Sequence, residues 1–400
     1  MKDFIQSSQR PAQFMVTEQL VMSLLSEMEL FLAYLAQQPL PLSGTKHLPA
    51  VKWLESLNGL LPDPDVITLT RPQPGHFSTA LALYLLARAS GLGRLETVKS
   101  RQMMVLNQAV FEQWQAMTDE ERYFNLLESF CNRLHCTAIG DRSWGGQRLF
   151  PSFVGDCLFG RGEQSPEEYL NNAKRHNPYL LRRFYAYGLR LFALFGMANV
   201  EIVDNGKELK EWSLTPWGIQ LITLSHSMIL DTLYGQKESD DDSDEYPFKE
   251  MIQVWCPTVQ GWLSIPDEDV AAGYILKVSL DKECWRKLAV PSGCTLEAVA
   301  MTILRAFRFD EIDHLYHFEY LDNYGAQRVI AHEAVTDVDG WADLLTLADI
   351  HPRVGMTMKY VFDYGENWIF DIRLEKACDQ MDGAIAVKEK HGKAPKQCAW

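Results

Sequence analysis

The stretch GYILKVSLDKECWRKLAVPSGCTLEAVAMTILRAF, residues 273–307, decides the fold of the C-terminal part of the chain. Apolar and β-branched residues are frequent in 273–280 and 284–290, on either side of a short Asp-Lys-Glu turn, which predicts two paired strands. Thr295 then caps an amphipathic helix over 295–307. Further strands are predicted at 314–320, 327–332, 358–364 and 368–376. The order β-β-α-β-β with a final hairpin predicts an α+β domain.

Several unusual residues are spaced along this region. Trp285 and Arg286 lie in the second strand, and His314, Leu315 and Phe318 follow the helix. The hairpin YVFDYGENWIFDIRLEK, residues 360–376, adds Tyr360, Asp363, Tyr364, Gly365, Glu366 and Trp368. Together they resemble the plasmid pRiA4b ORF-3-like family over about 273–376. The resemblance implies an α+β roll-like fold and little about activity, since such proteins are described as passengers of mobile elements, sometimes as resolvase-like. The family usually has a histidine where this chain has Phe370, so no mechanism that needs that imidazole is expected.

The hairpin at 360–376 has two interpretations. Strand alternation groups Tyr360, Phe362 and Tyr364, and also Trp368, Phe370, Ile372 and Leu374, on faces that can pack on the helix 295–307. In the first interpretation Asp363 only binds the amides of the turn. In the second, His314, Asp363 and Glu366 converge as a polar site for a ligand. The candidate ligand-binding residues are Trp285, Arg286, His314, Asp363, Glu366 and Trp368.

The N-terminal part shows a mostly helical pattern, in which one order of predicted elements occurs twice. Residues 80–114 and 187–224 each predict a helix, a glycine stop, two strands around a polar turn, and another helix. Asp204-Asn205-Gly206 is a strong turn signal, because Asn-Gly accepts positive φ. Both units resemble the winged-helix module. The alternative is a pair of helical hairpins whose β-ribbons serve as scaffold, or as dimer or protein contacts.

A basic window precedes the second of these units. No acid occurs from Tyr169 to Val200, and the window holds Lys174, Arg175, Arg182, Arg183 and Arg190 among aromatic residues. Cationic side chains neutralise phosphates, so these five residues are the candidate nucleic-acid contacts. The alternative is that the arginines cover apolar surface or pair with acids from elsewhere in the chain.

The composition indicates a globular protein of more than one domain. The net charge of −15 is uneven, and six acids fall between Glu238 and Glu245, which predicts a solvated linker. The expected domains are 1–130 and 131–235, each helical with a winged-helix-like unit, the linker 236–246, and an α+β domain over 247–400. The first apolar run, 20–36, is interrupted by polar residues and predicts a packed helix rather than a membrane span. The scattered cysteines and the missing secretory signal indicate a cytoplasmic protein.

Catalytic and cofactor motifs are not found. The chain has no phosphate-binding Gly-x-x-x-x-Gly-Lys-Ser/Thr loop and no Gly-x-Ser-x-Gly elbow. Cys131, His135 and Cys136 have metal-ligand side chains but lack a second ligand pair. Residues 247–400 lack the serine and arginine cluster of a serine recombinase. We therefore expect no catalytic residue, metal or cofactor.

The sequence favours a non-enzymatic binding or regulatory protein. Its partner would be DNA, through the winged-helix-like part, or a protein or small ligand at the 360–368 hairpin. The alternatives are an enzyme or ligand-binding protein with a polar site at that hairpin, and a structural module for protein–protein interaction. The oligomeric state and the identity of the partner do not follow from the sequence.

Overall fold

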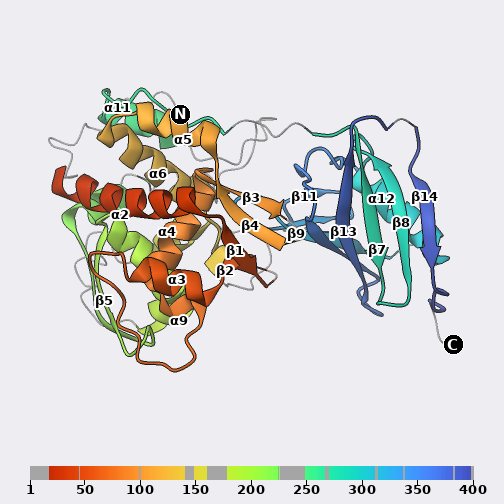
Figure 1. Ribbon diagram of the computed structural model, residues 1–400, viewed down its shortest axis with the longest axis horizontal. Helices are drawn as coiled ribbons and strands as arrows, with labels where there is room; N and C mark the ends of the chain where they lie inside the picture. Colours follow the sequence, from red (N-terminus) through yellow and green to blue (C-terminus); the bar gives the residue numbers. More distant parts are fainter. Residues whose placement is uncertain are drawn as a thin grey trace. The chain divides into compact units, whose positions relative to one another are not determined.

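The computed structural model describes residues 18–44, 46–98, 101–139, 148–159, 178–223, 225, 248–265, 270–310, 314–336, 338–381 and 383–397. Contacts between residues divide the chain into two compact units (Figure 1). The first comprises Met1–Arg94, Met104–Asp141 and Gln147–Ile265, and the second comprises Leu95–Met103, Arg142–Gly146 and Pro266–Trp400. The expected α+β class is confirmed, because the N-terminal region combines helices with short strands and the C-terminal region is a large mixed sheet.

The second unit is an eight-stranded sheet that carries the helix α12 (Leu296–Phe307). The strand order is β11-β10-β9-β12-β13-β7-β8-β14; β10 and β11 are parallel, and the other pairs are antiparallel. The strands are β7 (Gly273–Ser279), β8 (Trp285–Pro291), β9 (Tyr316–Leu321), β10 (Gln327–Ala331), β11 (Gly340–Trp341), β12 (Thr357–Phe362), β13 (Trp368–Cys378) and β14 (Ala386–His391). All the predicted strands of this region are present, and β11 and β14 are additional.

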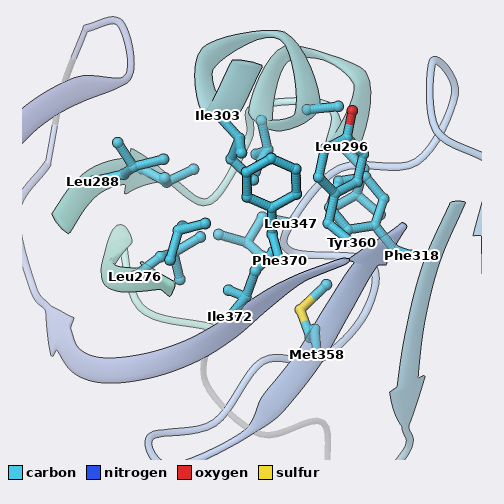
Figure 2. Packing of buried hydrophobic residues seen from close by; sticks show 14 of the residues in the cluster. Leu276, Leu288, Leu296, Ile303, Phe318, Leu347, Met358, Tyr360, Phe370 and Ile372 are labelled. Atoms are coloured by element: carbon cyan, nitrogen blue, oxygen red, sulfur yellow. The ribbon is translucent and has the colours of Figure 1, made fainter. Parts of the chain in front are cut away.

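One face of the sheet packs on α12 through alternate strand residues. The residues that form this core include Leu276, Phe318, Tyr360, Phe370 and Ile372, each at most 1% exposed. Figure 2 shows them grouped beneath Leu296 and Ile303 of the helix. The predicted cap is confirmed, since the Thr295 hydroxyl accepts a hydrogen bond from the Ala298 amide at 3.2 Å. Burial of each large side chain contributes roughly 1.5–3 kcal/mol, so this face holds the helix on the sheet.

One residue of the predicted apolar face lies elsewhere. β12 ends at Phe362, and Asp363 then adopts a positive φ of 57°, which interrupts the strand alternation. Tyr364 therefore does not share the buried face with Tyr360 and Phe362, and it is 40% exposed. The return strand follows the prediction, because Phe370 is buried there and Trp368 packs against the same core.

The first unit is built mainly from helices. They are α2 (Glu18–Gln37), α3 (Val51–Asn58), η1 (Pro74–His76), α4 (Ser78–Ala89), α5 (Gln108–Ala116), α6 (Asp119–Arg133), η2 (Cys136–Ile139), α7 (Leu149–Phe159), α9 (Pro178–Leu194) and α11 (Phe248–Trp255). Its strands are β1 (Leu40–Ser43), β2 (Leu48–Pro49), β5 (Ala198–Val203) and β6 (Glu208–Leu214). The strands β3 (Gly93–Val98) and β4 (Arg101–Leu106) are divided between the two units, because Leu95–Met103 belong to the second. β3 and β4 join β1 and β2 in a four-stranded sheet, and β5 and β6 form a separate hairpin.

The helix α2 is long and apolar enough to cross a membrane by length and composition alone over Leu20–Gln37. Here it packs against α4 and α6. Leu24, Met28, Phe31 and Leu35 are each at most 2% exposed, so the packed helix expected over 20–36 is found. The structure thus uses this helix as a core element of the first unit.

The two helix–ribbon–helix patterns are present locally. The helix before the first ribbon has no exposed face, whereas Tyr185 of the helix before the second ribbon is 41% exposed. All twelve residues of α4, the helix before β3, are buried. In α9, before β5, Phe184, Leu189, Leu191 and Phe192 are fully buried. A helix that enters a nucleic-acid groove must expose a face to it. The first ribbon, moreover, belongs to a larger sheet rather than standing alone as a wing.

The segment after α11 belongs to the first unit, whereas the sequence placed its residues in the C-terminal domain. α11 packs on α6, and the backbone that follows is held by α5 and α6 side chains. Glu121 accepts hydrogen bonds from the amides of Gly261 at 2.7 Å and Gln260 at 3.2 Å. Gln113 binds both backbone groups of Ser264, at 2.9 Å each. The expected linker at 236–246 lies outside the described residues.

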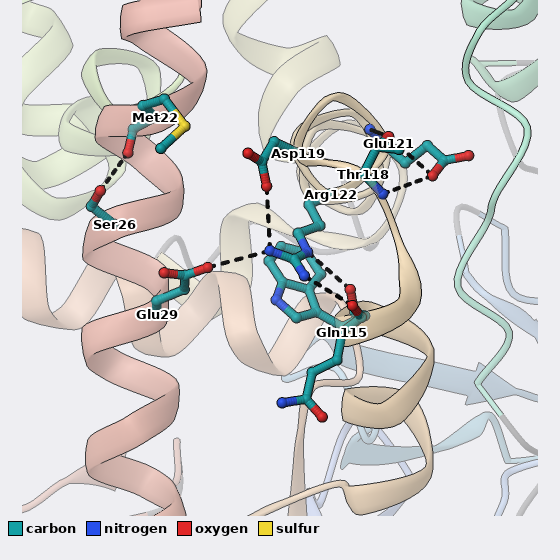
Figure 3. Close-up of polar contacts among 9 residues, drawn as sticks. Met22, Ser26, Glu29, Gln115, Thr118, Asp119, Glu121 and Arg122 are labelled. Carbon is teal, nitrogen blue, oxygen red and sulfur yellow. Dashed lines mark hydrogen bonds and ion pairs between the residues drawn. The ribbon is translucent and has the colours of Figure 1, made fainter.

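The turn between α5 and α6 is fixed by polar contacts (Figure 3). Thr118 and Glu121 form a capping box, in which each side chain binds the backbone amide of the other. Arg122 donates to the carbonyl oxygens of Trp114 and Gln115 and pairs with Glu29 of α2 at 3.4 Å. These contacts fix the turn between α5 and α6, the two helices whose side chains Gln113 and Glu121 bind the segment after α11.

Candidate functional site

The polar end of the second unit's sheet is centred on Asp363, in the turn between β12 and β13. Its Oδ1 accepts hydrogen bonds from the amides of Gly365 at 3.0 Å and Glu366 at 3.4 Å, as the first interpretation of the hairpin expected. Its Oδ2 lies 3.4 Å from Nδ1 of His314, one contact that the second interpretation expected. The carboxylate therefore both shapes the turn and orients the imidazole.

A second histidine, His317, lies beside the same turn and was not among the candidate residues. It is 3% exposed, and its Nδ1 lies 2.9 Å from the Tyr364 hydroxyl. Its Nε2 lies 3.1 Å from Oε1 of Glu319, and this hydrogen bond lowers the pKa of the Glu319 carboxyl. Burial raises the pKa of Tyr364. The sequence signal was the position of His317 between the core residues Tyr316 and Phe318, which places it on the opposite face of the sheet.

Glu366 does not join these contacts. Its side chain is exposed and, among the described residues, makes no hydrogen bond or ion pair. Of the predicted trio, the structure brings His314 and Asp363 together and leaves Glu366 as a free carboxylate on the same turn.

Trp285, Arg286 and Trp368 occupy other positions in the second unit. Arg286 is 5% exposed, and it donates to the carbonyl oxygens of Ala306 at 3.0 Å and His391 at 2.7 Å. These bonds join β8 to the C-terminal end of α12 and to β14. Trp285 stacks on His391 with ring centroids 5.3 Å apart, and Trp368 meets Phe309 edge to face at 4.9 Å. None of the three contacts the His314–Asp363 pair in the described structure.

The basic window is described only in part. Lys174 and Arg175 lie outside the described residues, as do the side chains of Arg182 and Arg183 in α9. Arg190 places its Nη2 3.9 Å from Oδ1 of Asp65, and its side chain is 21% exposed. This arginine is thus opposed by a carboxylate, as the alternative interpretation of the window expected.

The described residues show neither a metal-binding cluster nor an activated thiol at Cys131 or Cys294. Over these ranges, no group of three or more His, Cys, Asp or Glu side chains is placed to hold a metal ion. Burial raises the pKa of the Cys294 thiol, which opposes its use as a nucleophile. The pKa of Cys131 is also raised, by burial and then by Glu128. Both ring nitrogens of His317 already face Tyr364 and Glu319, so neither is free to activate a nucleophile.

The sheet, the helix α12 that covers one of its faces and the Asp363 turn define an α+β domain with a polar hairpin end. Residues 272–399 match the model of the family described as plasmid pRiA4b ORF-3-like protein, so the chain carries a domain of this family. The match extends past the expected end near 376 and includes β14.

The chain is similar to a solved structure, a protein of unknown function, MM3350, from Methanosarcina mazei Go1. The identity is 21%, the match covers 30% of this chain and 68% of that chain, and the TM-score is 0.27. No curated protein matches the chain.

Proposed function

We propose that the chain is a non-enzymatic binding protein whose C-terminal domain contacts a partner protein through the end of the sheet. The contact surface, here called the hairpin surface, consists of Leu315, Asp363, Tyr364, Glu366 and Ile369. The observation that carries the proposal is the exposure of three large apolar side chains around one fixed turn: 38% for Leu315, 40% for Tyr364 and 39% for Ile369. Aromatic and aliphatic anchors beside charged groups are typical of protein-contact sites.

Rigid support favours recognition at this surface. Asp363 holds the turn through two amide hydrogen bonds, and its own amide donates to the Leu315 carbonyl at 3.0 Å. Tyr364 is held by His317. A surface that is already ordered pays little conformational entropy when a partner binds.

The charge of the hairpin surface indicates the kind of partner. Asp363 and Glu366 are both acidic, and Glu366 has no partner in the described structure. Nearby acids are partly compensated, because Lys359 lies opposite both Glu319 and Asp371 in the sheet register. We expect a partner segment that places an arginine or lysine on Glu366 and an apolar side chain on Tyr364 and Ile369.

A peptide-display selection on the full chain tests this proposal. Selected peptides should be enriched in arginine or lysine next to an apolar residue, and Glu366→Lys should weaken their binding at least tenfold. Asp379→Lys is the matched control, since Asp379 is an exposed acid just beyond the other end of β13. Equal binding to wild type, Glu366→Lys and Asp379→Lys would refute the proposed surface.

A nucleic-acid contact is a second proposal, supported by the acid-free window from Tyr169 to Val200. It rests on Lys174, Arg175, Arg182 and Arg183, since Arg190 faces Asp65. Duplex DNA should bind at low salt, lose affinity steeply as salt rises, and bind less when Arg182 and Arg183 are replaced by alanine. Absence of binding at low salt would remove this proposal and leave the hairpin surface untouched.

A further inference from the structure

Three segments of the second unit meet at the first turn of α12. The Glu297 amide in that turn donates to the Ala342 carbonyl at 2.8 Å, and the Ala342 amide donates to the carbonyl of Ala331, the last residue of β10, at 2.8 Å. The start of α12, the loop after β11 and the residues after β10 are therefore adjacent. Each segment contributes one carboxylate, from Glu297, Asp343 and Glu333 respectively.

A buried phenol is directed at these carboxylates from the core. Tyr316 is 1% exposed, and its ring meets the ring of His332 edge to face at 5.4 Å. Burial, and after it the charges of Glu297, Asp343 and Glu333, raise the pKa of the Tyr316 hydroxyl. This hydroxyl makes no hydrogen bond to any residue that the structure describes. Because a buried tyrosine hydroxyl usually has a hydrogen-bond partner, its position beside the acids points to a ligand.

The three negative charges have little compensation. None of the carboxylates forms an ion pair or accepts a hydrogen bond within the described ranges, and Oδ1 of Asp343 is buried without a donor. Nδ1 of His332 accepts a hydrogen bond from the Ala334 amide at 3.2 Å, so that ring supplies no positive charge. The N-terminus of α12 supplies about half a unit charge. Most of the negative charge of Glu297, Asp343 and Glu333 is thus left for a cation from outside.

Apolar side chains lie next to the acids. The Leu344 amide donates to the Trp341 carbonyl at 3.2 Å, which closes a turn around Asp343. Trp341 is 45% exposed and Leu344 is 68% exposed, and the Trp341 indole is held by the Val335 carbonyl at 3.3 Å. An indole ring attracts ammonium groups, and both side chains can cover methylene groups.

We propose that these side chains bind a small organic polycation of the polyamine class, with its ammonium groups on Glu297, Glu333 and Asp343. Its methylene segments pack on Trp341 and Leu344, and the Tyr316 hydroxyl accepts a hydrogen bond from one ammonium group. The charge of the cluster disfavours an anion. A single metal ion is also disfavoured, because no three acidic, histidine or cysteine side chains in the described ranges are placed to hold one. The site shares no residue with the hairpin surface.

Calorimetric titration of the full chain with spermidine, putrescine and Mg²⁺ at 150 mM salt tests the proposal. We expect spermidine to bind at one site per chain, and putrescine, with one ammonium group fewer, to bind at least fivefold more weakly. Mg²⁺ at the same concentration should not displace spermidine. The double variant Glu297→Gln with Glu333→Gln should weaken spermidine binding at least tenfold. Both residues are exposed and make no side-chain contact with a described residue, so the variant should fold normally.

The double variant Asp371→Asn with Asp379→Asn is the control. It removes the same charge from two exposed acids in and just beyond β13, so it should bind spermidine as wild type does. Tyr316→Phe keeps the ring and removes only the hydroxyl, and it should weaken binding about fivefold. The proposal is overturned if spermidine does not bind, if the two double variants bind equally, or if Mg²⁺ displaces spermidine. Unchanged affinity in Tyr316→Phe would overturn the role given to the phenol.

Discussion

The carboxamide of Asn125 in α6 binds the backbone of Leu263, with Oδ1 accepting from the amide at 2.7 Å. Its Nδ2 donates at 2.9 Å to the carbonyl two residues earlier, at Gly261. One side chain therefore binds an amide and a carbonyl of the same segment, as the backbone of a neighbouring strand would. These two hydrogen bonds, together with those of Glu121 and Gln113, explain why the first unit continues to Ile265.

Replacing Asn125 with alanine should release the segment 256–264. Both hydrogen bonds to the segment are lost, and the amide of the buried residue Leu263 is left without its partner, which costs about 2 kcal/mol. Hydrogen exchange should show loss of protection in this segment and little change in the second unit. Asn199→Ala is the control, because Asn199 makes only an exposed contact with Ser213. Unchanged protection would contradict the account of this segment.

The attachment of the segment 256–264 to α6 should depend on pH, because Glu121 accepts hydrogen bonds from its amides. Hydrogen bonds from the amides of Thr118 and Gly261 lower the pKa of this carboxyl below its ordinary 4.5. A folded-state pKa below the unfolded value means that the contribution is complete above about pH 4.5 and is lost as the pH falls through the lowered value. Protection of 256–264 should therefore decline in acid. Glu121→Gln should abolish that dependence, and a wild-type decline that persists in the variant would refute the assignment.

Arg286 should prove to be a structural residue. Replacement by lysine removes the forked contacts to Ala306 and His391, and lysine does not reproduce that geometry. The free energy of unfolding of the second unit should fall by about 2–4 kcal/mol, since hydrogen bonds to charged groups contribute about 1.5–3 kcal/mol each. Denaturant unfolding monitored by hydrogen exchange in β14 measures the loss. Unaltered stability combined with lost partner binding would instead support a ligand contact.

Two substitutions of Asp363, to alanine and to asparagine, should destabilise the second unit to different degrees. Asp363→Ala removes the acceptor for two amides and the contact to His314, and it places alanine at positive φ, so the stability of the second unit should fall by about 2 kcal/mol. Asp363→Asn keeps an acceptor and tolerates that conformation, so its loss should be smaller. Thermal unfolding of both variants decides the point, and equal losses would show that the acceptor is unimportant.

Much of the fold could be predicted because local signals agreed with the final structure. The Asp-Asn-Gly turn at 204–206 lies between β5 and β6, as expected, and Thr295 caps the start of α12. β14 gave no signal, since an edge strand rich in lysine and glutamate has no apolar alternation. The His314–Asp363 contact was expected, but His317 was not, because its burial depends on the position of Tyr364. The pairing of Arg190 with Asp65 depends on a tertiary contact between distant segments, which single-sequence patterns do not contain.

The hairpin surface should bind a basic protein segment. The most direct measurement is an NMR titration of the full chain with an arginine-containing peptide from the display selection. We expect saturable shifts at Leu315, Tyr364 and Ile369, with an affinity that falls as salt rises and that is at least tenfold weaker in Glu366→Lys. Shifts confined to other residues, or an affinity that Glu366→Lys leaves unchanged, would contradict it.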